Sequence, residues 1–238
     1  MPDAVAVNLA SNLAAVRSEI AAACQRTGRD PTTVRLIAVT KSQGPEVLPH
    51  LAAAGVVDCG ENRIDHLEMM AANAPAGLRF HAIGRIQGRQ LADTVRLAQC
   101  LHSLCDPGHV DRFAKAIAAA GYTIERRYPV FVQVNTSGEA AKAGLEPDAL
   151  PAVLDRLRSI PACSVEGLMT MAPDFSENAD EASVRRCFAA CRELAGRHGL
   201  KRLSMGMSGD FALAIAEGAT EIRVGTRLFA EVTTGVTA

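Results

Sequence analysis

The sequence predicts a single α/β domain folded as a (β/α)8 TIM barrel with an extra helix at its N-terminus. The chain has 238 residues, and one barrel of roughly 200 to 250 residues would use all of them. Eight short, mostly apolar segments alternate with segments of helical periodicity, as in a closed parallel sheet covered by helices. Polar or glycine-containing segments follow most of these strands, where barrels place functional residues. An open, doubly wound sheet is the alternative.

The order of the elements follows from apolar periodicity and helix-stop signals. Apolar residues recur at helical spacing over residues 4–24, and Gly28 with Pro31 then ends this first helix. Strands are expected at residues 34–40, 56–60, 79–84, 100–104, 129–135, 164–171, 202–205 and 221–224. Helices are expected between them at residues 45–54, 62–74, 90–97, 110–120, 147–158, 180–198 and 210–217. Residues 1–238 are therefore expected to form one domain.

The composition and net charge of the chain argue against some classes of binding partner. Hydrophobic residues make up 48% of the chain and charged residues 21%, which suits a folded core with a polar surface. The formal net charge is -1 and no block of lysine and arginine stands out, which argues against a nucleic acid or membrane partner. The start lacks signal-peptide character, and no stretch reaches the roughly 20 apolar residues of a membrane helix. We therefore expect a cytoplasmic protein that binds small molecules.

The seven cysteines show no CxxC spacing, so they predict neither a disulfide framework nor a zinc knuckle. Cys187 and Cys191 lie four residues apart on one face of an expected helix. They could share a metal ion, but no histidine or carboxylate completes a ligand set. We interpret them as reduced core residues and expect no metal site.

Lys41 ends the first expected strand and is the first candidate for chemistry. A lysine at a strand end would lie at the barrel mouth, partly desolvated by its neighbours. Desolvation favours the neutral amine, which is the form that attacks an aldehyde. The alternative for Lys41 taken alone is an exposed lysine that opens a loop.

The last two loops of the expected barrel have the residues of a phosphate site. Ser208, at the start of a helix, offers a hydroxyl and free backbone N–H groups. Gly225 and Thr226 follow the last strand, where a glycine lets backbone donors approach an anion closely. The alternative makes Ser208 a helix cap and Gly225 a turn, but their joint position after strands seven and eight favours phosphate binding.

Arg223 lies in an otherwise apolar strand, where an unpaired guanidinium would be very costly. A structural carboxylate such as Glu61 could be its partner. The functional alternative is that Arg223 donates to the pyridine nitrogen of a cofactor, because arginine has donors and no acceptor. That contact would keep the ring nitrogen unprotonated and make the cofactor a weak electron sink.

These residues lie in ordered motifs that resemble the pyridoxal phosphate homeostasis family (YggS/PROSC-like), whose barrel is similar to the N-terminal domain of alanine racemase. The resemblance runs from about Leu36 to Phe229. Its motifs are Ala38-Val39-Thr40-Lys41, Gly60-Glu61-Asn62, residues 80–84 with Gln87, residues 132–139 with Lys142 and Gly144, residues 167–173, residues 203–208 with Asp210, and Arg223-Val224-Gly225-Thr226.

The resemblance implies a role for each of these site residues. It implies that Lys41 forms a Schiff base with pyridoxal 5'-phosphate (PLP) and that Asn62 lies beside the ring. It also implies that Arg223 faces the pyridine nitrogen, and that the phosphate is received by Ser208, Gly225 and Thr226. The fifteen-residue step from Ser208 to Arg223 is similar to the serine-to-arginine step of the racemases, which favours Ser208 over Ser204.

One segment departs from the family pattern. The chain has Gln87-Gly88-Arg89-Gln90 where the family usually has a lysine at the position of Gln90. Any secondary cofactor or regulatory contact that this loop makes in relatives is therefore in doubt for this chain.

The resemblance implies a PLP carrier in intracellular PLP homeostasis and not an enzyme. A racemase of this type needs a second proton-transfer group, typically a tyrosine from an additional β domain of a partner subunit. The only tyrosines here, Tyr122 and Tyr128, fall at the opposite end of the expected barrel. We expect a monomer that exchanges PLP with PLP-dependent apo-enzymes.

Two other functions remain open. One is a PLP-dependent racemase or lyase whose second group is Cys59, His81 or a water, although His81 is more readily explained as a hydrogen-bonded barrel residue. The other is a lysine-dependent aldolase barrel without a cofactor. Neither of these is favoured by the motifs.

Overall fold

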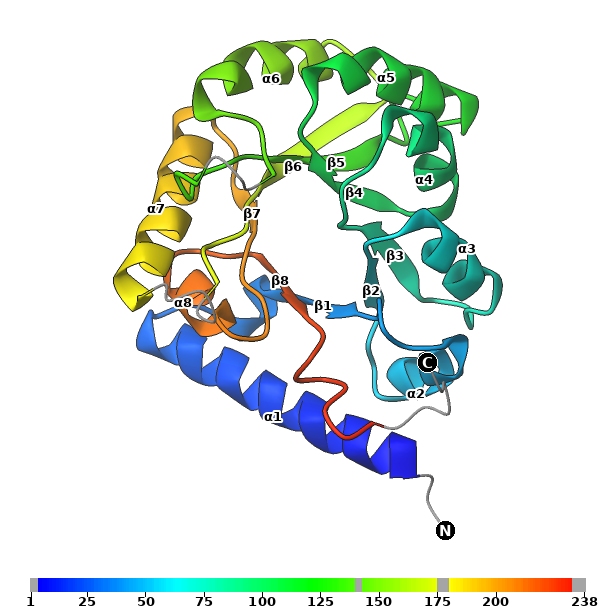
Figure 1. The fold of residues 1–238 in the computed structure, drawn as a ribbon, viewed down its shortest axis with the longest axis vertical. Helices are drawn as coiled ribbons and strands as arrows, with labels where there is room; N and C mark the ends of the chain where they lie inside the picture. The colour runs from blue at the N-terminus through cyan, green and yellow to red at the C-terminus, as the bar shows by residue number, and fades with distance from the viewer. Residues whose placement is uncertain (1–3, 140–142, 175–179, 233–238) are drawn as a thin grey trace.

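Eight parallel strands close into one barrel in the order β1-β2-β3-β4-β5-β6-β7-β8, with β8 pairing β1. The computed structural model describes residues 4–139, 143–174 and 180–232. Figure 1 shows the strands at the centre of the molecule and the helices in a ring around them. The predicted (β/α)8 TIM barrel is confirmed, and the open, doubly wound alternative is wrong.

The strands and helices follow the predicted alternation. The strands are β1 (Arg35–Val39), β2 (Asp58–Glu61), β3 (Arg79–Ala82), β4 (Cys100–Leu104), β5 (Tyr128–Gln133), β6 (Cys163–Met169), β7 (Arg202–Ser204) and β8 (Glu221–Val224). The helices are α1 (Ala4–Arg26), α2 (Leu48–Ala53), α3 (Ile64–Ala72), α4 (Leu91–Leu97), α5 (Val110–Ala119), α6 (Leu150–Arg158), α7 (Glu181–Arg197) and α8 (Phe211–Ala216).

Two of the predicted helices begin as tighter 3-10 turns. Pro45–Val47 precedes α2 and Pro147–Ala149 precedes α6. Each turn has proline at its first position, where the missing N–H costs nothing because the first turn of a helix leaves its N–H groups without internal acceptors. The predicted helices at 45–54 and 147–158 therefore include these turns.

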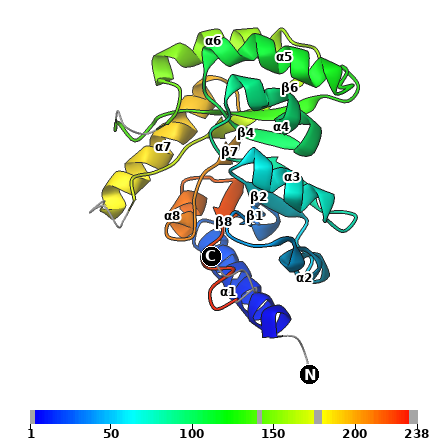
Figure 2. The ribbon, with the colours of Figure 1, turned by 45° about the vertical axis from the view of Figure 1, so that its right-hand side comes forward.

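Helix α1 holds the segment that follows β8. The Asn12 side-chain amide donates to the backbone carbonyl of Leu228 at 3.1 Å, and Arg227 forms an ion pair with Glu19. Figure 2 shows this C-terminal segment running alongside α1. The extra helix thus fixes the chain directly after the predicted phosphate loop at Gly225.

Buried side chains fall into an apolar layer and a partly polar interior. The large apolar cluster lies between the strands and the helices, and it includes Cys187 and Cys191, as predicted. A small separate cluster, Cys100, Phe131 and Met169, lies on β4, β5 and β6 inside the barrel. Buried polar side chains also point into the barrel, namely Asp58, His81, His102, Ser204 and Arg223.

Within the residues that the structure describes, every helix is too short or too polar to cross a membrane.

Candidate functional site

Four neighbouring strands bring the predicted site residues to one end of the barrel. β7 pairs with β8, β8 with β1, and β1 with β2. Parallel strands all end on the same side of a barrel, so the residues after them share one face. These residues are Ser208 after β7, Arg223, Gly225 and Thr226 at the end of β8, Lys41 after β1, and Asn62 after β2.

Ser208 and Gly225 are in direct contact. The Gly225 N–H donates to the Ser208 hydroxyl oxygen at 3.2 Å. Asp210, and not Ser208, occupies the cap position of α8, so the alternative that Ser208 is only a helix cap is wrong. Gly225 does begin a turn, because its carbonyl accepts from the Leu228 N–H at 2.8 Å.

Arg223 is buried inside the barrel and is held by uncharged groups. One terminal guanidinium nitrogen donates to the Ser204 hydroxyl at 2.8 Å, and the other donates to the Thr170 carbonyl at 3.1 Å. Burial lowers the pKa of Arg223 to about 10, which leaves the side chain charged near neutrality. The expected structural partner, Glu61, is not bonded to Arg223. That expectation is wrong because Glu61 is bonded to side chains next to Lys41 instead.

Lys41 is exposed, so the free protein does not supply the desolvation that the sequence predicts. Its side chain lines a small surface pocket of about 210 Å³ together with Arg63, Asp65, His66 and Met69. Gly225 packs against Val39, and a β-carbon added to Gly225 would lie 3.0 Å from the Val39 carbonyl oxygen. The turn that carries Lys41 therefore begins beside the Ser208 and Gly225 pair.

A buried cluster braces the turn at Lys41, and sequence reasoning missed it. The Thr40 hydroxyl donates to one carboxyl oxygen of Glu61, and His66 Nδ1 shares a hydrogen bond of 2.8 Å with the other. His66 Nε2 lies 3.0 Å from the Gln43 carbonyl oxygen. Burial raises the pKa of Glu61, although its hydrogen bonds to Thr40 and His66 act in the opposite direction. The cluster thus anchors Lys41 on both sides.

Asn62 and Thr226 are both exposed and follow β2 and β8 at the same end of the barrel. Asn62 rests on Gly84 of the third-strand motif, where an added β-carbon would lie 2.0 Å from the Asn62 carbonyl oxygen. Any larger residue at position 84 would therefore displace the Asn62 backbone. Asn62 lines a surface pocket of about 680 Å³, which shares Arg63 and Asp65 with the smaller pocket that Lys41 lines.

The segment that departs from the family pattern has a local structural role. Gly88–Gln90 is a 3-10 turn, and the Gln87 and Gln90 side chains cap each other's backbone across it. The Gln87 N–H donates to the Gln90 side-chain oxygen at 3.0 Å. Gln87 and Gln90 therefore cap the 3-10 turn that leads into α4. Lys142, the other lysine in the family motifs, lies outside the described residues.

The groups considered as second proton-transfer residues are poorly placed for that role. Burial raises the pKa of Cys59 to about 12, so its thiol stays protonated. His81 is hydrogen bonded on both ring nitrogens, to His102 and to Asp58, each at 2.9 Å. The interpretation of His81 as a hydrogen-bonded barrel residue is therefore confirmed. Tyr128 starts β5, at the far end of the barrel, and burial raises its pKa well above the ordinary value.

The comparison with known families gives one match over most of the chain. The family described as "Alanine racemase, N-terminal domain" matches residues 11–231. The protein named "Pyridoxal phosphate homeostasis protein" in Pseudomonas aeruginosa is 38% identical over 224 residues, which is 93% of this chain and 94% of that protein. The protein of the same name in Deinococcus radiodurans is 39% identical over 217 residues, which is 91% of this chain and 98% of that protein.

The chain belongs to the pyridoxal phosphate homeostasis family.

Two solved structures are similar to this chain. PipY of Synechococcus elongatus, solved with PLP bound, is 31% identical with a TM-score of 0.80, and the match covers 93% of this chain and 100% of that one. Alanine racemase of Corynebacterium glutamicum is 16% identical with a TM-score of 0.70, and the match covers 98% of this chain but only 63% of the racemase. That likeness concerns the barrel fold alone.

Proposed function

We propose that this chain holds PLP as a Schiff base on Lys41 and acts as a carrier in intracellular PLP homeostasis. The observation that carries the proposal is the shared location of Lys41, Arg223 and the Ser208 and Gly225 pair on neighbouring strands. Membership of a family in which PipY has been solved with PLP bound supports the same ligand for this chain.

The donors at the mouth fit the chemical groups of PLP. Among the described residues, Arg223 has acceptors for two of its five N–H groups, which leaves three for a ligand such as a pyridine nitrogen. The Ser208 hydroxyl and the Gly225 N–H lie together and suit a phosphate oxygen. The Lys41 amine has no acceptor within the described part of the chain and is exposed to an incoming aldehyde.

PLP, when bound, supplies an aldehyde and an electron-withdrawing ring. The Lys41 amine would hold the cofactor covalently through this aldehyde, whose oxygen would leave as water. Ser208 and Gly225 would hold the phosphate, and Arg223 would orient the ring through its nitrogen. Because Arg223 only donates hydrogen bonds, the ring nitrogen would remain an acceptor and the ring would withdraw electrons weakly.

A carrier role follows from these residues better than catalysis does. The weak electron sink slows removal of an α-proton, and Cys59, His81 and Tyr128 are each buried. The exposure of Lys41 leaves the C=N bond accessible to water or to a second amine, which suits release of the cofactor to a PLP-dependent apo-enzyme.

The test of the proposal is retention of PLP by purified protein. The wild type and the matched variants Lys41→Ala and Lys201→Ala are mixed with PLP, freed of unbound cofactor by gel filtration and examined for visible absorbance. The wild type and Lys201→Ala are expected to retain the band, because Lys201 is exposed before β7, and Lys41→Ala is expected to lose it. A colourless wild-type protein would contradict PLP binding and favour a cofactor-free aldolase.

The same preparations separate carrier from enzyme. Amino acids in heavy water are expected to exchange their α-hydrogen no faster with the loaded protein than with free PLP. Substantial exchange that disappears in Lys41→Ala would show a racemase or lyase that uses a water as its second group.

A further inference from the structure

A continuous line of buried polar side chains runs through the barrel to Arg223. Asp58 Oδ1 lies 2.9 Å from His81 Nε2, and His81 Nδ1 lies 2.9 Å from His102 Nε2. His102 Nδ1 lies 2.8 Å from the Ser204 hydroxyl, which accepts from Arg223 at 2.8 Å. The members come from β2, β3, β4, β7 and β8, and their side chains are all at least nine-tenths buried.

The two ends of this line dictate the direction of every hydrogen bond in it. Arg223 can only donate, so the Ser204 oxygen accepts from Arg223. Among the described residues, His102 Nδ1 is the remaining partner of the Ser204 hydroxyl, so the buried hydroxyl proton is satisfied by donation to His102 Nδ1. At the other end an ionised Asp58 can only accept, so His81 Nε2 must carry a proton. Hydrogen bonds to His81 and Arg79 hold the pKa of Asp58 below its ordinary value, although its burial acts to raise it.

The histidine pair completes the direction. His102 is neutral, because burial and the charge of the nearby Arg223 hold its pKa well below the ordinary value. With Nδ1 accepting from Ser204, its single proton is on Nε2 and is donated to His81 Nδ1. Each group therefore donates to the next in the order Arg223, Ser204, His102, His81, Asp58.

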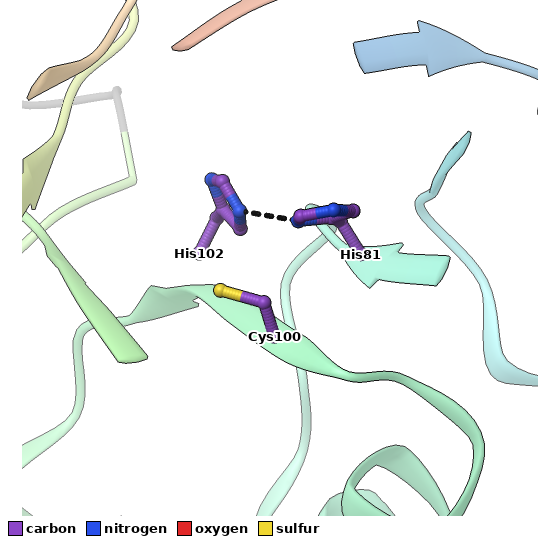
Figure 3. Close-up of side chains that lie close together, drawn as sticks. All are labelled: His81, Cys100 and His102. Carbon is purple, nitrogen blue, oxygen red and sulfur yellow. Dashed lines mark hydrogen bonds between the residues drawn. The ribbon is translucent and has the colours of Figure 1, made fainter. Parts of the chain in front are cut away.

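Figure 3 shows His81 and His102 turned toward each other, with Cys100 beside them. Ligand atoms of these three residues lie within 4.8 Å of one another, so a metal ion is the competing explanation. Two nitrogens on one tetrahedral zinc ion, with bonds of about 2.0 to 2.1 Å, lie roughly 3.3 Å apart. The observed 2.9 Å between the ring nitrogens is instead the length of a hydrogen bond. Arg35 and Arg202 also act on His102 and would disfavour a cation.

We infer that Asp58, His81, His102 and Ser204 form a one-directional hydrogen-bond chain that positions Arg223 toward a ligand at the barrel mouth. This role rests on the proposed function, because the ligand in question is the pyridine nitrogen of PLP. The chain turns the Ser204 lone pairs toward Arg223, which fixes the guanidinium plane and the direction of its unused N–H groups. None of the four residues needs to touch the ligand, so they are positioning residues.

The hydrogen-bond chain also connects the two ends of the barrel. A pocket of about 250 Å³ reaches His81 and Cys100 from the end at which the strands begin, between Arg35, Arg79 and Arg202. Arg79 donates to both carboxylate oxygens of Asp58, at 2.9 and 3.1 Å. The ion pair at this opening thus holds the Asp58 end of the hydrogen-bond chain, and Arg223 forms the other end.

The first test determines the direction of the hydrogen bonds between the two histidines, in the wild-type protein without PLP. Long-range ¹⁵N–¹H NMR of the imidazoles is expected to find His81 and His102 both neutral, with the proton on Nε2. A proton on Nδ1 of His102, or a doubly protonated His102, would overturn the inference. Added Zn²⁺ is expected to leave both resonances unchanged, and displacement of the shared proton by zinc would show a metal site instead.

The second test reads the effect on bound PLP. Ser204→Ala removes an acceptor from Arg223, and His102→Phe keeps the stacking on Phe131, whose ring centroid lies 4.4 Å away, while removing both hydrogen bonds. Both variants are expected to shift the visible band of bound PLP and to weaken its affinity by roughly 2- to 10-fold, the value of one net hydrogen bond. Thr94→Val, which removes a buried hydroxyl that donates to the Gln90 carbonyl at 2.8 Å, is expected to change neither the band nor the affinity.

The two tests distinguish the inference from the function on which it rests. If Ser204→Ala and His102→Phe fold and bind PLP with the band and affinity of the wild type, the positioning role is wrong and the carrier proposal stands. If the wild type shows no band, the carrier proposal and the positioning role both fail, and the NMR result still decides whether the chain has the stated direction.

Discussion

The Ser208 hydroxyl is the acceptor for the Gly225 N–H at 3.2 Å in the free protein. A phosphate oxygen beside this pair would accept from the Ser208 hydroxyl and would replace the Ser208 oxygen as the acceptor for the Gly225 N–H. A hydrogen bond to a charged group contributes about 1.5 to 3 kcal/mol, and a phosphate contact of this kind belongs to that class. Substitution of Ser208 is therefore a direct test of phosphate binding by this loop.

Ser208→Ala is expected to weaken PLP binding by roughly 10- to 150-fold, as the loss of one charge-assisted hydrogen bond would. The measurement is fluorescence or absorbance titration with PLP. Ser159→Ala, at the exposed end of α6, is the matched control and is expected to bind like the wild type. Equal affinities for Ser208→Ala and the wild type would remove Ser208 from the site.

Glu61 predicts a pH dependence of stability. Burial raises its pKa in the folded protein above the ordinary 4.5, so folding favours its protonated form. Its contribution to stability is therefore fully present below pH 4.5 and is lost as the pH rises through the raised pKa. Urea unfolding over this range is expected to show a decline in the wild type that Glu61→Gln lacks. Parallel pH profiles for the two proteins would contradict this assignment.

The candidate site could be predicted only in part at the residue scale. Lys41, Arg223 and Ser208 are recognisable because each combines a reactive or charged group with a strand end. The supporting contacts were not predicted, since each joins different strands. Ser204 reaches Arg223 from β7, and His102 reaches Ser204 from β4. Glu61 reaches Thr40, the residue before Lys41, from β2. Polar residues within strand segments are the signal that could have identified the interior chain.

At the scale of elements, the strand ends are set by close contacts that periodicity does not reveal. β3 ends at Ala82, two residues before the predicted end, and Gly84 then passes under the backbone of Asn62. The predicted order of strands and helices is confirmed because alternation of apolar and helical segments depends on local sequence alone. The exact residue at which a strand ends depends on its contacts with neighbouring segments.

Gly84→Ala tests this contact, because the new β-carbon would lie 2.0 Å from the Asn62 carbonyl oxygen. Overpacking of this kind costs about 1 to 3 kcal/mol, so we expect a lower free energy of unfolding and weaker PLP binding. Gly196→Ala is the matched control, since a β-carbon on that residue of α7 meets nothing within 4 Å. It is expected to gain about 0.5 to 1 kcal/mol of stability. Equal stabilities for the two variants would contradict the argument.

At the scale of the whole molecule, the chain is a barrel whose exposed apolar residues are scattered. Among the described residues, the large exposed hydrophobic side chains are Val7 on α1, Met69 on α3, and Val57, Ile124 and Met171 in three different loops. Single exposed apolar residues do not make an association surface. We therefore keep the prediction of a monomer. Sedimentation equilibrium is expected to give the mass of one chain with and without PLP, and a dimer would contradict this prediction.

We propose that PLP is attached to the amine of Lys41, and the sequence contains few other lysines that could carry it. The sequence contains four lysines, Lys41, Lys115, Lys142 and Lys201. Borohydride reduces a C=N bond to a stable amine, so treatment of the PLP-loaded protein followed by peptide mass mapping records which lysine held the cofactor. We expect a phosphopyridoxyl adduct on Lys41 in stoichiometric yield. A comparable adduct on Lys142 or another lysine, with Lys41 unmodified, would contradict it.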